Sequence, residues 1–263
     1  MIPTADRLTA GAVRGALSGA AALLRVEVRE SVDSTNARLL AAGEAGEAQG
    51  AVLLAGTQTA GRGRMGRNFY SPDDTGIYMS VLLRPQTGAD AMAVTAQAAV
   101  AACEAIEAAT PARPAIKWVN DILIGERKVC GILAESRALT AQGGGFVVLG
   151  IGMNVYAPPE GFPAQIAGVA GCISAQRQSG LRSALAAGFL NSFMHWYADG
   201  CPQELAAAYA HRCALTGKRV RVLRACGERA ALVLGTDAQC RLRVRYDNGE
   251  EEALGSGEIS IRL

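Results

Sequence analysis

The sequence predicts an α+β protein with a mixed β-sheet flanked by helices and a small C-terminal β-barrel. Apolar runs typical of strands alternate with helical segments, and polar residues and glycines gather where these runs end. After residue 214 the pattern changes to short alternating strands separated by Gly, Asp and Asn turns. We therefore expect a helical extension over residues 1–24, a main domain over 25–214 and an SH3-like barrel over 215–263.

Strands are expected at the apolar runs of the main domain, which are residues 24–32, 51–55, 76–83, 116–124, 129–135 and 146–155. The fourth and fifth of these runs form a hairpin in this interpretation. Helices are expected at amphipathic or alanine-rich segments, which are residues 37–42, 90–109, 179–198 and 202–212. Ser34 or Thr35 is a candidate N-cap for the first helix, and Ser179 for the third. One short helix is expected in the extension.

The barrel carries four expected strands, at residues 218–223, 230–234, 240–246 and 259–263. Arginines alternate with apolar residues along these strands. We interpret the arginines as the solvated face of the barrel, because the net charge of the chain is only +2 and a nucleic-acid platform is more basic.

Composition indicates a soluble cytoplasmic protein. Half of the residues are hydrophobic, which suffices for a large core, but no uninterrupted apolar run reaches the roughly 18 residues that span a bilayer. The seven cysteines are odd in number and widely spaced, without a Cys-x-x-Cys pair, so a disulfide framework and a zinc knuckle are not indicated. We expect no membrane partner and a reducing compartment.

The segment from Gly56 to Pro72, which we call the arginine loop, is the most informative part of the chain. Its arginines, Arg62, Arg64 and Arg67, alternate with glycines, Gly61, Gly63 and Gly66. Glycine lets the backbone approach a ligand closely, and guanidinium groups match phosphate and carboxylate oxygens. The segment is neither a phosphate loop nor a Gly-x-Gly-x-x-Gly turn that opens a helix. It predicts an anion-binding loop, and the alternative is a solvated basic turn.

Other polar clusters end apolar runs: Ser34-Thr35-Asn36, Gln58 with the loop arginines, Lys117 with Asn120 and Asp121, and Lys128 with Asn154. Lys117 lies in an apolar run, so it is either functional, paired with Asp121 or extended to the surface. No Ser/His/Asp or Cys/His arrangement stands out. Cations, amides and glycines suit chemistry on an ionised, phosphorylated substrate, where positioning and charge stabilisation dominate.

Six motifs together resemble the bacterial biotin protein ligase family. They are Asp33-Ser34-Thr35-Asn36, the run from Gln58 to Arg67, Lys117-Trp118-Val119-Asn120-Asp121, the run from Lys128 to Leu133, the run from Gly150 to Val155, and Gly257-Glu258-Ile259-Ser260. They occur in the family's order from about residue 25 to the end. Val119 replaces a usual proline and Phe69 a common tryptophan, and we expect modest effects from both. About 25 residues precede the first strand, so the resemblance suggests the monofunctional class, without a DNA-binding domain.

The resemblance implies a class II synthetase-like catalytic domain and a two-step reaction. Biotin would attack the α-phosphate of ATP, with Mg²⁺, to give biotinyl-adenylate, and a lysine of a biotin carboxyl carrier protein would then take the biotinyl group. No DNA partner is expected, and the chain would be a monomer or weak homodimer. The implied catalytic residues are Arg62, Arg64 and Lys117. The implied biotin-binding residues are Ser34, Thr35, Asn36, Gln58, Gly61, Arg62, Gly63, Arg64, Lys117 and Gly131. The implied nucleotide-binding residues are Arg64, Arg67, Phe69, Asn120, Lys128 and Asn154, with Asn154 also at the metal.

Two alternatives stay open. A lipoate ligase or octanoyltransferase shares this catalytic fold, but its substrate lacks the ureido head that the Ser-Thr-Asn cluster suits. A non-catalytic biotin sensor or nucleic-acid-binding regulator is the other, and the small net charge disfavours DNA binding.

Overall fold

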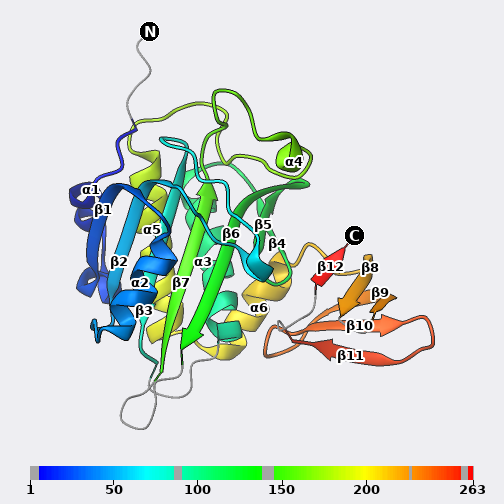
Figure 1. The fold of residues 1–263 in the computed structure, drawn as a ribbon. Coiled ribbons are helices and arrows are strands. Elements are labelled where there is room, and N and C mark those ends of the chain that lie inside the picture. The colour runs from blue at the N-terminus through cyan, green and yellow to red at the C-terminus, as the bar shows by residue number, and fades with distance from the viewer. Residues whose placement is uncertain (1–5, 86–90, 138–144, 225–226, 256–259, 263) are drawn as a thin grey trace.

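The computed structural model describes residues 6–85, 91–137, 145–224, 227–255 and 260–262. Its centre is a seven-stranded sheet in the order β1-β2-β3-β7-β6-β5-β4 (Figure 1). The strands are β1 (Arg25–Val32), β2 (Ala51–Gln58), β3 (Gly76–Leu83), β4 (Pro114–Lys117), β5 (Asp121–Ile124), β6 (Arg127–Arg137) and β7 (Phe146–Asn154). β1 and β2 are parallel and every other neighbouring pair is antiparallel, so the sheet is mixed, as predicted.

Helices cover both faces of the sheet. The main hydrophobic core lies between the sheet and the long helices, α3 (Ala91–Ala109), α5 (Leu181–Ala198) and α6 (Pro202–Arg212). On the other face, α2 (Thr35–Glu44) buries Leu39 and Leu40 against Leu53, Leu82 and Phe146. The alternation of side chains along β2, β3 and β7 between these two cores explains why these strands read as continuous apolar runs.

α3 is long and apolar enough, by length and composition alone, to cross a membrane. Here eleven of its residues are buried and it packs within the main core, beside α5 (Figure 1). The prediction of a helix buried against the sheet is therefore confirmed.

Three local predictions need correction. The apolar run 116–124 is two strands, β4 and β5, which fold back on each other around the turn 118–120. Ser179 does not cap α5, because the N-cap residue is Gly180, with a φ of 77° and no side-chain hydrogen bond. The extension holds α1 (Ala10–Gly15) and a 3-10 helix, Gly19–Leu23, where one helix was expected. Ser34, by contrast, caps α2 as predicted, since its Oγ accepts a hydrogen bond from the Ala37 amide.

The C-terminal strands form a separate five-stranded antiparallel sheet, in the order β11-β10-β9-β8-β12. They are β8 (Arg219–Arg224), β9 (Gly227–Thr236), β10 (Leu242–Tyr246), β11 (Glu251–Leu254) and β12 (Ser260–Arg262). β11 was not expected, and Cys240 lies in the turn before β10. The segment 256–259, with most of the last motif, lies outside the described residues, as does Cys226. The six described cysteines are free.

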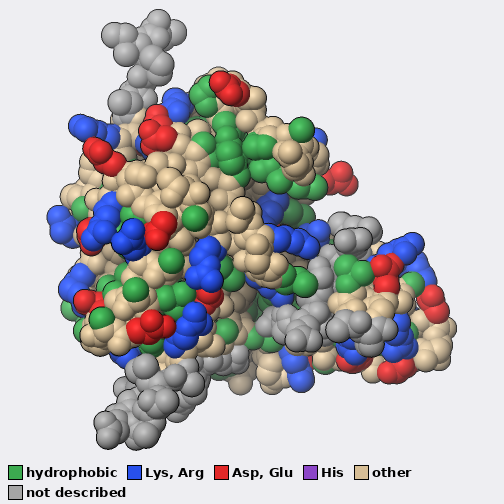
Figure 2. All heavy atoms as spheres, in the orientation of Figure 1, with side chains coloured by type: hydrophobic (Ala, Val, Ile, Leu, Met, Phe, Trp, Pro, Cys, Tyr) green, Lys and Arg blue, Asp and Glu red, His purple; other side chains and the backbone are tan. Residues whose placement is uncertain are grey.

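Acidic and basic side chains are interspersed on the C-terminal sheet (Figure 2). Its arginines pair with neighbouring carboxylates, for example Arg221 with Glu228 and Arg229 with Glu250. The side chains of Arg219 and Arg221 are 65% and 68% exposed. This arrangement agrees with the interpretation of a solvated, charge-balanced face.

Candidate active site

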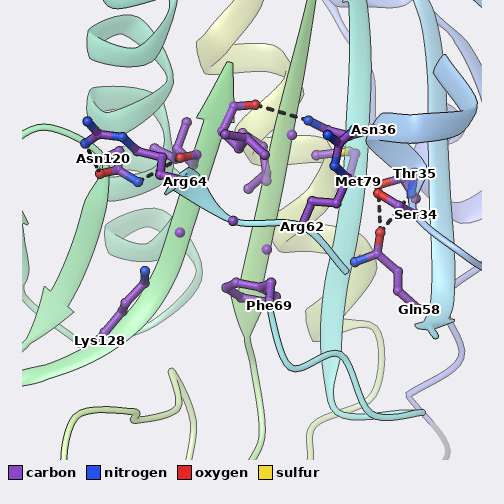
Figure 3. A pocket seen from close by; sticks show the side chains of 17 residues that line it. Ser34, Thr35, Asn36, Gln58, Arg62, Arg64, Phe69, Met79, Asn120 and Lys128 are labelled. Carbon is purple, nitrogen blue, oxygen red and sulfur yellow. Dashed lines mark hydrogen bonds between the residues drawn. The ribbon is translucent and has the colours of Figure 1, made fainter. Parts of the chain in front are cut away.

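A pocket opens beside the N-terminus of α2, over β6 and β7 (Figure 3). Helix α2, the central strands and the arginine loop each contribute to its wall. The lining residues are Ser34, Thr35, Asn36, Gln58, Arg62, Gly63, Arg64, Phe69, Met79, Asn120, Lys128, Gly131, Ile132, Leu133, Gly150, Ile151 and Gly152. The lining contains three cationic side chains and no carboxylate.

One side of the pocket, which we call the neutral wall, consists of Thr35, Asn36, Gln58 and Ser80. The Thr35 amide and hydroxyl both donate to Gln58 Oε1, at 2.8 and 3.1 Å. Behind them, Ser80 Oγ lies 2.8 Å from Thr35 Oγ1 and 2.6 Å from Asn36 Oδ1. Gln58 Nε2 donates to the hydroxyl of Ser71 at 3.0 Å. Because each group already has a partner, the wall holds its shape without a ligand.

Asn36 has little freedom to turn. Its Nδ2 donates to Glu135 Oε2 at 2.9 Å and to the Leu133 carbonyl at 3.4 Å. Strand β7 passes so close that a Cβ on Gly150 would lie 2.0 Å from Asn36 Oδ1. Only glycine fits there, which gives a packing reason for the glycines of this run.

The other side, which we call the cationic mouth, carries Arg62, Arg64 and Lys128. Arg62 pairs with Glu135 at 3.3 Å, and Lys128 Nζ lies 2.6 Å from Asp121 Oδ1. Arg64 Nη1 donates to Asn120 Oδ1 at 3.1 Å. Burial lowers the pKa of Arg64, although a guanidinium stays charged at neutral pH.

Phe69 forms the floor between wall and mouth. Its ring lies over two strands, since a Cβ on Gly152 or Gly131 would come within 2.4 or 3.1 Å of it. The ring meets Tyr78 edge-on at 6.4 Å, and burial raises the pKa of Tyr78 to about 12, so Tyr78 is neutral. The loop is held in place by the hydrogen bond from the Phe69 amide to the Gly61 carbonyl, at 2.9 Å.

The structure brings most of the sequence-predicted residues together in this pocket, namely Ser34, Thr35, Asn36, Gln58, Arg62, Gly63, Arg64, Phe69, Asn120, Lys128 and Gly131. Arg67 lines an adjoining hollow, which shares Ser34, Arg62 and Arg64 with the pocket. Gly61 lies behind the wall, where a Cβ would meet the Phe69 carbonyl at 2.4 Å.

Lys117 and Asn154 are not among the lining residues. Lys117 ends β4, half-buried and in register with Asp121. Asp121 forms its ion pair with Lys128, and no ion pair of Lys117 occurs among the described residues. Asn154 Nδ2 donates to the Gly171 carbonyl at 3.1 Å. The roles assigned to these two residues stay predictions.

Sequence reasoning missed Ser80 in the neutral wall and Glu135 beside it. Ser80 is the one small polar side chain in the apolar run of β3, and Glu135 is the first charged residue after the apolar stretch of β6. A lone polar residue in a buried strand is the signal that could have found them, because it needs a partner.

A resident metal site does not fit the described residues. They contain no group of three or more His, Cys, Asp or Glu side chains that could hold an ion. The two carboxylates that contact the mouth are both engaged, Asp121 by Lys128 and Glu135 by Arg62.

The fold and the chemistry of the pocket suit a class of protein that binds a small ligand with an uncharged polar head and an anionic end. Comparison with known proteins agrees with this class and narrows it. Residues 28–154 match the biotin/lipoate A/B protein ligase family, and residues 215–262 match the biotin protein ligase C-terminal domain.

A biotin–[acetyl-CoA-carboxylase] ligase of Mycobacterium tuberculosis is 36% identical over 205 residues, which cover 75% of this chain and 74% of the relative. The bifunctional ligase/repressor BirA of Bacillus spizizenii is 41% identical over 127 residues, or 48% of this chain. That match spans only 39% of the relative's own length.

Among solved structures, the biotin protein ligase from Aquifex aeolicus in complex with biotin and ATP has the same fold. The TM-score is 0.76 at 24% identity, over 90% of this chain and 98% of the other. This chain belongs to the biotin protein ligase family.

Proposed function

We propose that the protein is an ATP-dependent ligase that activates biotin as biotinyl-5'-adenylate and transfers it to a lysine of a biotin carboxyl carrier protein. The observation that carries the proposal is the joining, in one pocket, of the neutral wall and the cationic mouth, with no carboxylate in the lining. Such a pocket suits a ligand whose head is polar but uncharged and whose other end is an anion.

In the first step, the neutral wall would hold the ureido ring through hydrogen bonds from and to Thr35, Asn36 and Gln58. The biotin carboxylate would then lie toward Arg62 and Arg64 and attack the α-phosphate of ATP there. The acyl–phosphate bond forms as the bond between the α- and β-phosphates breaks, and pyrophosphate leaves. The difficulty of this step is the approach of two anions, and fixed guanidinium groups offset their repulsion. Magnesium, bound to ATP as part of the substrate, neutralises phosphate charge. Lys117, at the end of β4, is expected to contribute a further positive charge.

In the second step, the carrier lysine amine would attack the acyl carbon of the mixed anhydride. The new amide bond forms as the bond from the acyl carbon to the phosphate oxygen breaks, and AMP leaves. The anhydride must be kept from water in the meantime. We expect the exposed part of the arginine loop, around Met65, to fold over it, and protease protection of the loop by biotin plus ATP would test this.

The second candidate is a lipoate or octanoate ligase, because the matching family description covers both substrates. A lipoyl-type substrate has no ureido group. It would leave the hydrogen-bonding groups of the neutral wall facing an apolar chain, at a cost in affinity. The neutral wall therefore favours biotin.

The test measures pyrophosphate release and then transfer to a purified carrier domain, with ATP, Mg²⁺ and either biotin or lipoate. We expect activity with biotin and no activity with lipoate. Arg64→Ala and Lys117→Ala should lower the rate by about a hundredfold or more, as for the loss of a charge that stabilises the transition state. Arg221→Ala, which removes an exposed arginine from the C-terminal sheet, is the matched control. Charging by lipoate but not biotin would overturn the substrate, and full activity of Lys117→Ala would remove that residue from the site.

A further inference from the structure

The turn 118–120 between β4 and β5 lies where the main domain meets the C-terminal sheet. Its first two residues are deeply buried, with Trp118 5% and Val119 2% exposed. Its third residue, Asn120, lines the pocket. The turn therefore has one side in the interface between the two sheets and the other in the site.

Two hydrogen bonds hold the buried side of the turn, one to the C-terminal sheet and one from α6 of the main domain. The indole Nε1 of Trp118 donates to the backbone carbonyl of Cys240, in the loop before β10, at 3.0 Å. The hydroxyl of Tyr209, on α6, donates to the Val119 carbonyl at 3.1 Å. Both bonds are buried, where a donor or acceptor left without a partner costs most.

The Cys240 carbonyl is itself presented by a fixed turn. Asp237 Oδ1 accepts hydrogen bonds from the amides of Gln239 and Arg241, at 3.0 and 2.8 Å. The Cys240 amide donates to the Asp237 carbonyl at 2.9 Å, and Cys240 has a φ of 58°. The carboxylate of Asp237 thus determines where the carbonyl points.

On the pocket side, Asn120 connects the turn to the arginine loop and to β6 through hydrogen bonds. Its Oδ1 accepts the hydrogen bond from Arg64, at 3.1 Å, and its Nδ2 donates to the Ile132 carbonyl at 2.8 Å. The Ile132 amide returns a bond to the Asn120 carbonyl at 2.9 Å. With these bonds fixed, a shift of the turn would move the anchor of Arg64.

We propose that the C-terminal sheet is a positioning element of the active site. It acts through the Cys240 carbonyl and Trp118, which is a positioning residue, to hold Asn120 where it can orient Arg64. This inference rests on the proposed function, because it assigns Arg64 to the nucleotide step. It also predicts that substitutions at the interface leave the geometry of the neutral wall unchanged, because no hydrogen bond joins the wall to the turn.

The experiment compares two substitutions, one on each side of the interface. Trp118→Phe keeps an aromatic ring but removes the indole donor, and Asp237→Ala loosens the turn that carries the acceptor. We expect kcat/KM for ATP in biotin-dependent pyrophosphate release to fall about tenfold and about threefold, respectively, as for a lost buried hydrogen bond. The double variant should lose about tenfold, because both changes break one contact, whereas independent effects would multiply to about thirtyfold. The Kd for biotin should rise by less than kcat/KM for ATP falls, because the neutral wall is unchanged and Arg64 meets only the carboxylate end of biotin.

The chain supplies its own control, because it has only two tryptophans. Trp196 is 9% exposed and donates its indole N–H to Glu104 at 3.0 Å, between α5 and α3. Trp196→Phe therefore makes the same substitution and removes a part-buried indole hydrogen bond between two helices, outside the turn. A general loss of stability would affect both variants alike, so ATP kinetics that change only in Trp118→Phe support positioning. Equal losses in the two variants, unchanged kinetics in Trp118→Phe or a thirtyfold loss in the double variant would overturn the proposal.

Tryptophan fluorescence tests this inference independently of the proposed function. It also does not require that Trp118→Phe fold. In Trp196→Phe, Trp118 is the remaining tryptophan, and its burial should protect it from acrylamide quenching. Adding Asp237→Ala should increase that quenching if the interface holds the indole, and unchanged quenching would overturn the contact. If wild type releases no pyrophosphate with biotin, the proposed function fails, and the quenching result still decides whether the interface holds Trp118.

Discussion

In the neutral wall, Thr35, Asn36 and Ser80 are each less than 5% exposed, whereas the side chain of Arg62 in the cationic mouth is 45% exposed. The wall is built on β2, β3 and the first turn of α2, so regular structure fixes its backbone. The mouth is mostly carried by the arginine loop, in which Met65 is 66% exposed and adopts a positive φ of 56°.

The difference teaches where specificity and reactivity are placed. The groups of the wall hold one another in place, so they present their remaining hydrogen-bonding positions to an uncharged head and lose little entropy when the ligand binds. The cationic mouth lies on an exposed loop, and such a loop can close after both substrates have bound. Closure would stabilise charge and exclude water. Glu135 touches both regions, since its two carboxylate oxygens serve Asn36 and Arg62 separately.

The largest effect is expected from a pair of glycine substitutions, one in each region. In Gly150→Ala the new Cβ would lie 2.0 Å from Asn36 Oδ1, so Asn36 must leave its place. We expect biotin affinity, measured by calorimetry, to fall about a hundredfold, because several buried hydrogen bonds are lost together. In Gly66→Ala nothing lies within 4 Å, and the cost is the strain of alanine at a φ of 72°.

Gly66→Ala should therefore leave biotin affinity within about twofold, while a strain of about 1 kcal/mol slows the ATP-dependent step. Thermal unfolding of both variants checks that each is folded. Equal losses of biotin affinity would contradict the division of the pocket into a fixed wall and a separate mouth.

The sequence predicted the wall and mouth unequally well. Ser34 was predicted to cap α2 because helix starts have a local signature, and the arginine loop was found because its composition is unusual. Ser80 was missed because its contact with Asn36 depends on the packing of α2 over β3, which joins residues 44 apart in sequence. The turn 118–120 was missed because Lys117, Asn120 and Asp121 were interpreted as site residues within one strand, although Asn and Asp also favour turns. The Ser80 contact, by contrast, depends on tertiary structure and has no local pattern.

An intermediate effect is expected at Glu135, where the two regions meet. Glu135→Gln keeps an oxygen that can accept from Asn36 Nδ2 but removes the charge opposite Arg62. Because the Arg62 side chain is nearly half exposed, the lost pair is worth about 0–1 kcal/mol, and we expect up to about a fivefold change. That change should appear in the ATP-dependent rate and as faster tryptic cleavage in the arginine loop.

Arg229→Gln breaks a comparable exposed pair, with Glu250 at 2.8 Å on the C-terminal sheet, and serves as the control. It should leave both the rate and the cleavage of the arginine loop unchanged. A loss of biotin affinity in Glu135→Gln as large as in Gly150→Ala would mean that the charge of Glu135 holds the wall itself.

The smallest effect concerns pH. The side chains of the neutral wall do not titrate between about pH 5 and 9. At the edge of the wall, the hydrogen bond from the Ser34 amide and then that from Arg38 lower the pKa of Asp33 below its ordinary value. A lowered folded-state pKa means that Asp33 stabilises the start of α2 above its unfolded pKa of about 4, and that this contribution is lost as the pH falls through the folded-state pKa. Asp33 is mostly exposed, so the effect on biotin affinity should be less than about threefold.

The measurement is biotin affinity from pH 3 to 8 in wild type and in Asp33→Asn. The titration of biotin itself cancels in this comparison, because both proteins bind the same ligand. We expect the two curves to differ by a constant factor at neutral pH and to converge as the pH falls through the lowered folded-state pKa of Asp33, where the wild-type carboxylate becomes neutral too. Curves that stay parallel throughout would show that the charge of Asp33 does not affect biotin binding at the wall. Biotin affinity would then depend on the neutral groups of the wall and not on the charges around it.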